Sequence, residues 1–226
     1  MNYKQHNTYV GPMFLDVDES EEMRQRAETV YEPAKTKMLE HIVESGMVFL
    51  DVGVNKGWFS CLASKLIGFD GLVYSFEPMP SNIEWIKKTI ELSPARENVM
   101  LHEQALGDCD GTTVFTMGRR SGAHTMEYHP TWKGSELTVK VNRWDSMNLI
   151  HPDVVKIDVE CSELRVLSGM RRLLEQDKRI AFFIDVHTWM GVDLKDVQNV
   201  FSHYGFKIHD VLSRCEVVAT KGDWNI

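Results

Sequence analysis

The chain has 226 residues, of which 43% are hydrophobic and 26% are charged, and its formal net charge is -8. This length suits one α/β domain with a short extension, and the composition excludes disordered and fibrous proteins. The negative charge disfavours non-specific binding to nucleic acid or to an anionic membrane. No apolar run reaches the roughly 18 residues that a membrane span needs.

The cysteines indicate the redox compartment. Four are present, Cys61, Cys109, Cys161 and Cys215, and no two form a C-x-x-C pair. This scatter argues against a zinc ribbon or a disulfide framework and favours a reducing environment. The first residues lack the apolar segment of a secretory signal. We therefore expect a cytoplasmic protein.

Residues 1–45 are predicted to form an extension ahead of a main domain over residues 46–226. Within it, residues 12–15 predict a short strand, and the charge-rich residues 16–28 predict a solvated helix or a lid. A further helix is expected from about Tyr31 to Glu44, where apolar residues fall on one stripe and Gly46 follows the end.

The strongest pattern lies in residues 47–59. An apolar run ends in Asp51, the loop residues Gly53, Asn55 and Gly57 follow, and the apolar spacing of a helix then begins. This pattern predicts a strand, a tight loop and a helix, which is how an open parallel α/β sheet begins a nucleotide site. The glycines allow a sharp turn and close approach of a ligand to the backbone.

The next predicted strand, residues 72–76, ends in Glu77. A carboxylate at this place can accept hydrogen bonds from two ribose hydroxyls. The structural alternative for the whole pattern is a packing loop with Glu77 as a capping residue.

Asn55 helps to decide which nucleotide would bind. It stands where the dinucleotide fingerprint has its second glycine, and a pyrophosphate needs bare backbone there. No Gly-Lys-Ser/Thr follows, so the loop is not a P-loop either. S-adenosylmethionine carries a sulfonium cation and no phosphate, and an acidic loop suits a cation better than a diphosphate.

Strands and helices alternate through most of the remaining chain, which predicts a doubly wound, mainly parallel sheet. Helices are expected over residues 57–66, 81–92 and 193–204, with one continuous helix after Ser162. Strands are expected over residues 98–102, 153–160, 179–186, 206–208 and 216–219.

Residues 108–150 break this alternation. Residues 112–116 and 137–141 alternate like a pair of antiparallel strands. The polar loop between them contains Arg119, Arg120, His124, His129 and Trp132. Long insertions in compact domains are usually functional or mobile, so we interpret this one as a lid on the substrate side. The alternative is a surface hairpin with solvated charges.

In such a sheet, ligands bind beyond the carboxyl ends of the strands. The residues predicted there are Asp51, Glu77, Gln104 with Ala105, Asp158 and His187. The loop at Gln104 and Ala105 is expected to contact an adenine.

Methyl transfer to oxygen needs a methyl donor held in line, an acceptor hydroxyl and a group that takes the proton. His187 or Asp158 could take it, and a histidine pKa near 6.5 suits a base at neutral pH. The structural alternatives are a hydrogen-bonded histidine at a strand end, and an acid that caps a helix or pairs with Lys156. Asp158, Glu160 and His187 could also hold a divalent cation, but their spacing is not diagnostic, and no metal is assigned.

Several motifs, taken in order, resemble those of FkbM-family methyltransferases. The resemblance covers about residues 31–190. It rests on Asp51-Val52-Gly53-Val54-Asn55-Lys56-Gly57, Phe76-Glu77-Pro78 with Asn82, Ala105-Leu106-Gly107-Asp108, Lys156-Ile157-Asp158-Val159-Glu160 with Ser162-Glu163-Leu164, Val166-Leu167 and Gly169, Tyr31-Glu32-Pro33 and Ile184-Asp185-Val186-His187.

The resemblance implies a class I methyltransferase fold, Rossmann-like and seven-stranded, with S-adenosylmethionine as cofactor. It implies O-methylation of a hydroxyl on a sugar, glycan or secondary metabolite. The acidic charge argues against a nucleic-acid partner, and the sequence leaves a homodimer open. The cofactor-holding roles of the family fall on Gly53, Asn55, Gly57 and Glu77.

The chain departs from the family at three places. Cys161 stands where a glycine is usual, Trp144-Asp145 replaces Leu-Asp, and Lys56 replaces an apolar residue. Cys161 puts the usual acceptor geometry in doubt and keeps open a catalytically silent binding or scaffold protein. An NAD-dependent oxidoreductase is the other rival. A nucleic-acid methyltransferase is opposed by the acidic charge and by the lack of an Asp/Asn-Pro-Pro-Tyr/Phe element.

Overall fold

The computed structural model describes residues 2–92, 96–117, 124–125, 135–210, 212–213 and 215–226. They fall into two compact units, Met1–Glu103 and Gln104–Ile226, so the expected boundary at residue 45 lies inside the first unit. Seven strands form a mainly parallel sheet, three from the first unit and four from the second. The α/β fold class expected from the alternation is confirmed.

The first unit begins with an antiparallel hairpin, β1 (Lys4–Thr8) and β2 (Gly11–Leu15), of which only β2 was predicted. The hairpin packs on α4 (Pro80–Leu92), where the Tyr3 ring stacks on Trp85 with 3.9 Å between centroids. Helix α1 (Glu21–Glu28) follows, capped by Ser20 Oγ, which accepts from the Met23 amide. Helix α2 (Pro33–Ile42) comes next, close to its predicted span.

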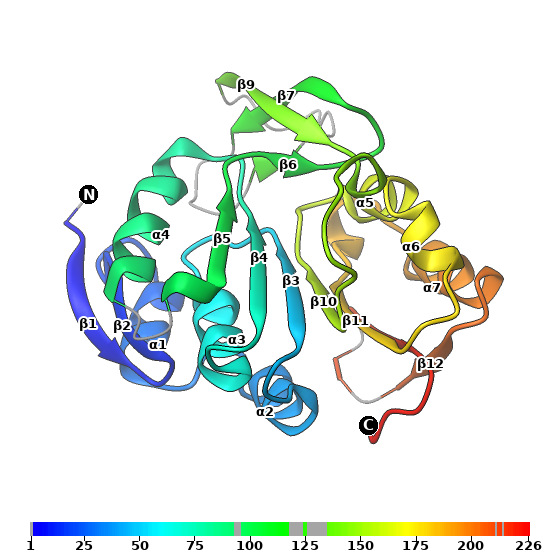
Figure 1. The fold of residues 1–226 in the computed structure, drawn as a ribbon. Helices are drawn as coiled ribbons and strands as arrows, with labels where there is room; N and C mark the ends of the chain where they lie inside the picture. The colour runs from blue at the N-terminus through cyan, green and yellow to red at the C-terminus, as the bar shows by residue number, and fades with distance from the viewer. Residues whose placement is uncertain (1, 93–95, 118–123, 126–134, 211, 214) are drawn as a thin grey trace. The chain divides into compact units, whose positions relative to one another are not determined.

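Three parallel strands form the centre of the first unit (Figure 1). Their residues are almost all buried in β3 and β4, as expected where helices cover both faces of a parallel sheet. The elements are β3 (Val48–Val52), α3 (Trp58–Ile67), β4 (Leu72–Phe76), α4, the short 3-10 helix η1 (Arg96–Asn98) and β5 (Val99–His102).

The second unit contributes four strands to this sheet. Strands β10 (Val154–Ile157) and β11 (Ile180–Asp185) are parallel, whereas β13 (Glu216–Lys221) runs antiparallel to both β11 and β12 (Lys207–His209). Helix α7 (Leu194–His203) covers them, with the Phe201 ring centroid 5.1 Å from that of Phe182. Asp193 caps α7 by accepting from the Lys195 amide.

Among the described residues, the insertion and the two residues of β6 just before it form a four-stranded sheet in the order β6-β9-β7-β8. Its members are β6 (Ala105–Leu106), β7 (Gly111–Met117), β8 (His124–Thr125) and β9 (Glu136–Asn142). The antiparallel pairing of β7 with β9 confirms the predicted strands. Of the loop residues singled out above, Arg119, Arg120, His129 and Trp132 lie outside the described residues, and only the backbone of His124 is described.

The helix predicted after Ser162 is interrupted. The structure has two short helices, α5 (Glu163–Ser168) and α6 (Arg171–Glu175), and Ser162 makes no side-chain capping bond. A Cβ at Gly169 would lie 1.9 Å from the Gly107 carbonyl oxygen, and the Gly169 carbonyl accepts from the Asp145 amide, in the 3-10 helix η2 (Trp144–Ser146). This close approach of another backbone segment breaks the helix.

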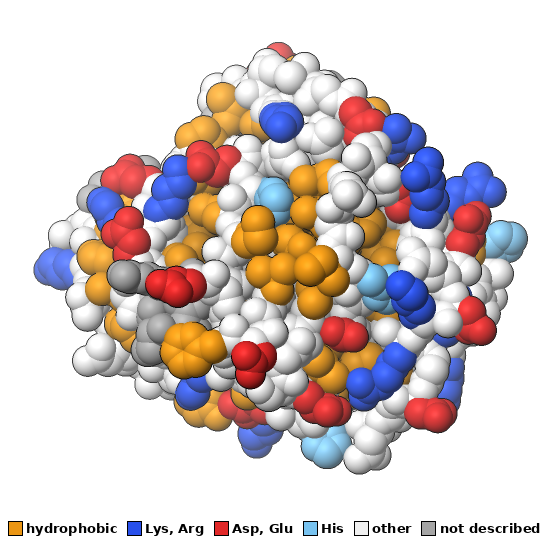
Figure 2. Space-filling model, in the orientation of Figure 1, with side chains coloured by type: hydrophobic (Ala, Val, Ile, Leu, Met, Phe, Trp, Pro, Cys, Tyr) orange, Lys and Arg blue, Asp and Glu red, His pale blue; other side chains and the backbone are white. Residues whose placement is uncertain are grey.

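The exterior has mixed charge. Acidic and basic side chains are intermixed on the face shown in Figure 2. Among the helices of the described residues, none combines the length and the apolar character that crossing a bilayer requires.

Candidate active site

The loop between β3 and α3 has the backbone geometry that its sequence predicts. Gly53, Asn55 and Gly57 have φ of 82°, 53° and 92°. This left-handed region favours glycine, and asparagine is one of the few other residues that enters it readily. The Gly53 amide donates to the Phe76 carbonyl oxygen at 3.0 Å, which holds the start of the loop against the end of β4.

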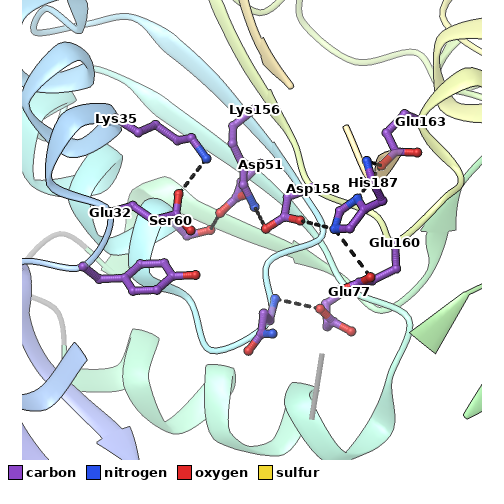
Figure 3. A network of polar contacts seen from close by, with 12 residues as sticks. Glu32, Lys35, Asp51, Ser60, Glu77, Lys156, Asp158, Glu160, Glu163 and His187 are labelled. Atoms are coloured by element: carbon purple, nitrogen blue, oxygen red, sulfur yellow. Dashed lines mark hydrogen bonds and ion pairs between the residues drawn. The ribbon is translucent and has the colours of Figure 1, made fainter. Parts of the chain in front are cut away.

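Glu77 closes this loop. Its carboxylate is buried, and its Oε2 accepts from the Asn55 amide at 2.8 Å (Figure 3). Its Oε1 accepts from the Met79 amide at 3.0 Å. A carboxylate offers about four acceptor positions, and these two bonds orient the group at the end of β4. The structure therefore brings together two of the residues that the sequence singles out.

Asp51 points into the interior. Its side chain is fully buried, and Oδ2 accepts from the Ser60 hydroxyl at 2.7 Å, while Ser60 also bonds Ser75 at 2.8 Å. These contacts join β3, α3 and β4. The environment of Asp51 thus suits a residue that fixes the loop.

Three buried cations lie around the loop, and the sequence pattern did not indicate their burial. Arg26 of α1 lies 3.4 Å from the Asn55 side-chain oxygen, and Lys35 of α2 lies 5.5 Å above the Phe59 ring. Lys56, in the loop itself, donates to the Tyr3 hydroxyl at 2.6 Å. Burial lowers the pKa of Lys56, although Glu19 opposes this effect. The sequence-based case for a sulfonium cofactor assumed an acidic loop. The structure shows that buried cations also lie beside this loop.

Gln104 and Ala105 begin the second unit. Ala105 belongs to β6 and pairs with Val141, where the sequence predicted a loop. The Gln104 amide lies 3.5 Å from the Met147 sulfur, and both Gln104 and Ala105 are buried.

His187 lies at the centre of a polar cluster in the second unit (Figure 3). It directly precedes the 3-10 helix η3 (Thr188–Met190). Its Nδ1 lies 2.5 Å from Glu163 Oε1, and its Nε2 lies 3.6 Å from Asp158 Oδ1 and 3.4 Å from Glu160 Oε2. The two predicted base candidates are therefore neighbours, and Glu163 is a contact that the sequence did not reveal.

The carboxylates determine the charge of His187. Burial alone would lower its pKa, but the hydrogen bond with Glu163 and the charges of Glu160, Asp158 and Glu163 raise the pKa to about 9. The imidazole is thus protonated at neutral pH. In this form it does not accept a proton.

The turn after β10 is strained. Glu160 and Cys161 have φ of 26° and 68°, in the region that favours glycine. The Cys161 side chain is buried, and its sulfur donates to the Met190 carbonyl at 3.7 Å. The thiol thus links the turn after β10 to the one after β11.

The family model for the methyltransferase FkbM domain matches residues 51–208. The chain belongs to the FkbM methyltransferase family. The matched FkbM region includes the glycine loop, Glu77, Asp158 and His187, and it excludes Arg26 and Lys35.

One relative has a described substrate. The hexuronic acid methyltransferase AglP of Haloferax volcanii is 28% identical over 170 residues, which are 74% of this FkbM-family chain and 66% of AglP. The chain therefore spans just under two thirds of the length of this relative.

Two solved structures have the same fold. FkbM from Methylobacillus flagellatus superposes with a TM-score of 0.56 and 15% identity, over 82% of this chain and 50% of that one. Aeropyrum pernix fibrillarin, solved with S-adenosyl-L-methionine bound, superposes with a TM-score of 0.51 and 16% identity, over 83% and 73%. The class I methyltransferase fold is thus confirmed for this FkbM-family chain.

Proposed function

We propose that this protein is an S-adenosylmethionine-dependent O-methyltransferase whose acceptor is a hydroxyl of a sugar. The observation that carries the proposal is the bond from the Asn55 amide to the buried Glu77 carboxylate at 2.8 Å, within a chain of the FkbM family. This bond places a buried carboxylate beside a left-handed loop. Such a pair suits the ribose and the adjacent part of an adenosyl cofactor.

Each cofactor-binding residue has a role in this proposal. Glu77 accepts from the ribose hydroxyls, and Gly53, Asn55 and Gly57 present backbone to the cofactor. Gln104 and Ala105 lie against the adenine. Asp51 positions the loop through Ser60. The cofactor supplies an electrophilic methyl group on its sulfonium.

Asp158 takes the proton in this proposal. Because His187 is charged at neutral pH, it is not in the form that accepts a proton. Lys156 Nζ and His187 Nε2 both lie 3.6 Å from Asp158 oxygens, and these cations favour the ionised carboxylate. The acceptor hydroxyl becomes strongly acidic as its oxygen binds the methyl group, so an ionised carboxylate is a sufficient base.

Trp189 supports a sugar acceptor. It follows His187 by two residues, and its side chain is 67% exposed, although most tryptophans are largely buried. Its backbone is fixed, since the Met190 amide donates to the His187 carbonyl at 3.0 Å and the Met190 carbonyl accepts from Cys161. The C–H face of a sugar ring stacks well on such an indole. AglP, by its name, acts on a hexuronic acid, which is also a sugar.

Calorimetric titration with S-adenosylmethionine, and with NAD as the comparison ligand, tests the proposal. We expect the wild-type protein to bind only the former, and Glu77→Gln to weaken that binding roughly 100-fold, because hydrogen bonds to a charged acceptor are lost. Glu84→Gln, at an exposed carboxylate of α4, is the matched control. Binding of NAD alone, or unchanged affinity in Glu77→Gln, would contradict the assignment.

Trp189→Ala should raise the KM for a sugar acceptor about tenfold and leave the affinity for S-adenosylmethionine unchanged, because stacking contributes about 1–1.5 kcal/mol. Trp189→Phe should raise this KM less than Trp189→Ala, because the phenyl ring retains part of the stacking surface. Initial rates with neutral and hexuronic sugars give the KM values. Phe69→Ala, at another exposed aromatic residue, is the control. An unchanged KM in Trp189→Ala would exclude stacking on this ring.

A further inference from the structure

Arg26 lies on α1, outside the region that the family model matches. Its side chain is almost fully buried, which is rare for arginine without a specific partner. Nη2 pairs with Glu22 Oε1 at 2.6 Å, and the guanidinium carbon lies 4.0 Å from the centre of the Tyr31 ring. Nη1 donates to the Asn55 side-chain oxygen at 3.4 Å, which brings the positive charge to the glycine loop.

One donor of this buried guanidinium is not used. Among the described residues, Arg26 Nε is buried and has no hydrogen-bond partner. Arginine stays protonated, so this N–H always needs an acceptor, and leaving a buried donor unsatisfied is costly. The Asn55 contact is also long for a hydrogen bond to a cation, which is normally 2.7–2.9 Å. The guanidinium therefore has capacity for one more anionic partner.

The surroundings also suit an anion. Lys35 is buried and pairs with Glu32 at 2.6 Å, and it lies over the ring of Phe59 in the first turn of α3. The N-terminus of α3 has no side-chain capping bond, and unsatisfied amides at this end of a helix attract negative charge. Positive charge near the loop between β3 and α3 thus comes from three sources, which are Arg26, Lys35 and the start of α3.

S-adenosylmethionine contains one anionic group, the carboxylate of its methionyl part. We propose that Arg26 binds this carboxylate, so that the N-terminal segment completes the cofactor site of the FkbM domain. The inference rests on the proposed use of S-adenosylmethionine. The proposal also explains why positive charge lies around the loop, since this charge suits the carboxylate of the cofactor and not its sulfonium.

Two ligands separate this role from a purely structural one. S-adenosylhomocysteine has the carboxylate, whereas 5′-methylthioadenosine has the same adenosine and thioether and lacks the carboxylate. In calorimetric titrations, Arg26→Met should weaken S-adenosylhomocysteine binding about 30- to 100-fold and 5′-methylthioadenosine binding less than threefold. Arg26→Lys keeps the charge without the planar fork, so the variant should retain the fold. Its affinity for S-adenosylhomocysteine should be about 5 to 10 times weaker than that of the wild type.

Arg24→Met is the control, because Arg24 is an exposed residue of the same helix. It should leave both affinities unchanged. Equal weakening of the two ligands by Arg26→Met or Arg26→Lys would overturn the assignment, since it would show that Arg26 only packs the loop. If the wild-type protein binds neither ligand, the proposed cofactor itself is wrong, and this inference is overturned with it.

Discussion

Replacing Asp158 with asparagine should lower kcat for methyl transfer roughly 100- to 10,000-fold, the range that general-base catalysis contributes. The amide cannot take the acceptor's proton, but it keeps the shape of the side chain. The 3.6 Å distances from Asp158 to Lys156 and His187 are ion-pair distances, so the substitution removes the charge that these two contacts share. Affinity for S-adenosylmethionine should change less than about threefold.

Initial rates with a radiolabelled methyl donor, together with calorimetry, measure both quantities. Asp177→Asn, at an exposed carboxylate of the second unit, should behave like the wild type. A kcat within tenfold of wild type in Asp158→Asn would rule out Asp158 as the base.

The pH dependence of kcat in the wild-type enzyme also tests whether Asp158 or His187 is the base. Its pKa is raised to about 9, so the ring is charged at lower pH. If the charged ring supports Asp158, kcat should be constant from about pH 7 to 8 and should fall as the pH rises through 9. If His187 were the base, kcat would instead rise toward pH 9. Initial rates corrected for loss of the cofactor at alkaline pH distinguish the two.

Replacing His187 with glutamine should lower the free energy of unfolding at pH 7 by about 3–5 kcal/mol. The Glu163 carboxylate is fully buried 2.5 Å from His187 Nδ1, and removing one partner of a buried ion pair leaves the other charge uncompensated. The double variant Glu163→Gln/His187→Gln should recover most of this loss, because it has no buried charge at the site. Urea unfolding of the wild type, His187→Gln, Glu163→Gln and the double variant measures the coupling between the two residues.

This stability contribution should depend on pH. The pKa of His187 is raised on folding from about 6.5 to about 9, so the contribution is fully present below pH 6.5 and is lost as the pH rises through 9. The difference between wild type and His187→Gln should therefore shrink over this interval. His203→Gln, at an exposed histidine of α7, should show neither effect. A pH-independent difference would mean that packing, not charge, stabilises the site.

The features that depend on neighbouring residues in the chain were predictable. Gly53, Asn55 and Gly57 indicated the left-handed loop because few residues adopt that conformation, and buried apolar runs indicated β3, β4, β10 and β11. Features that depend on distant segments were not. Helix α5 ends because Gly169 meets Gly107, and no local signal in the helix reveals that contact.

The same limit applies to the charges of the site. Arg26 lies in a segment predicted to be a solvated helix or a lid, and Lys35 lies in the next predicted helix, outside its apolar stripe. Only tertiary packing buries these two side chains. His187 was expected to be a neutral base because an isolated histidine has a pKa near 6.5. Its charged state results from three carboxylates that reach it from the turn after β10 and from α5.

The bond from Lys56 to the Tyr3 hydroxyl bears on how this protein can be recombined with its relatives. A buried ammonium is tolerated only while its acceptors are present, and here these are Tyr3, Asn82 and, at 3.6 Å, Glu19. A chimera that joins residues 51–226 to a foreign N-terminal segment would inherit the cation without two of its partners. The exchangeable module is therefore larger than the region that the family model matches, and positions 3, 19 and 56 should be exchanged together.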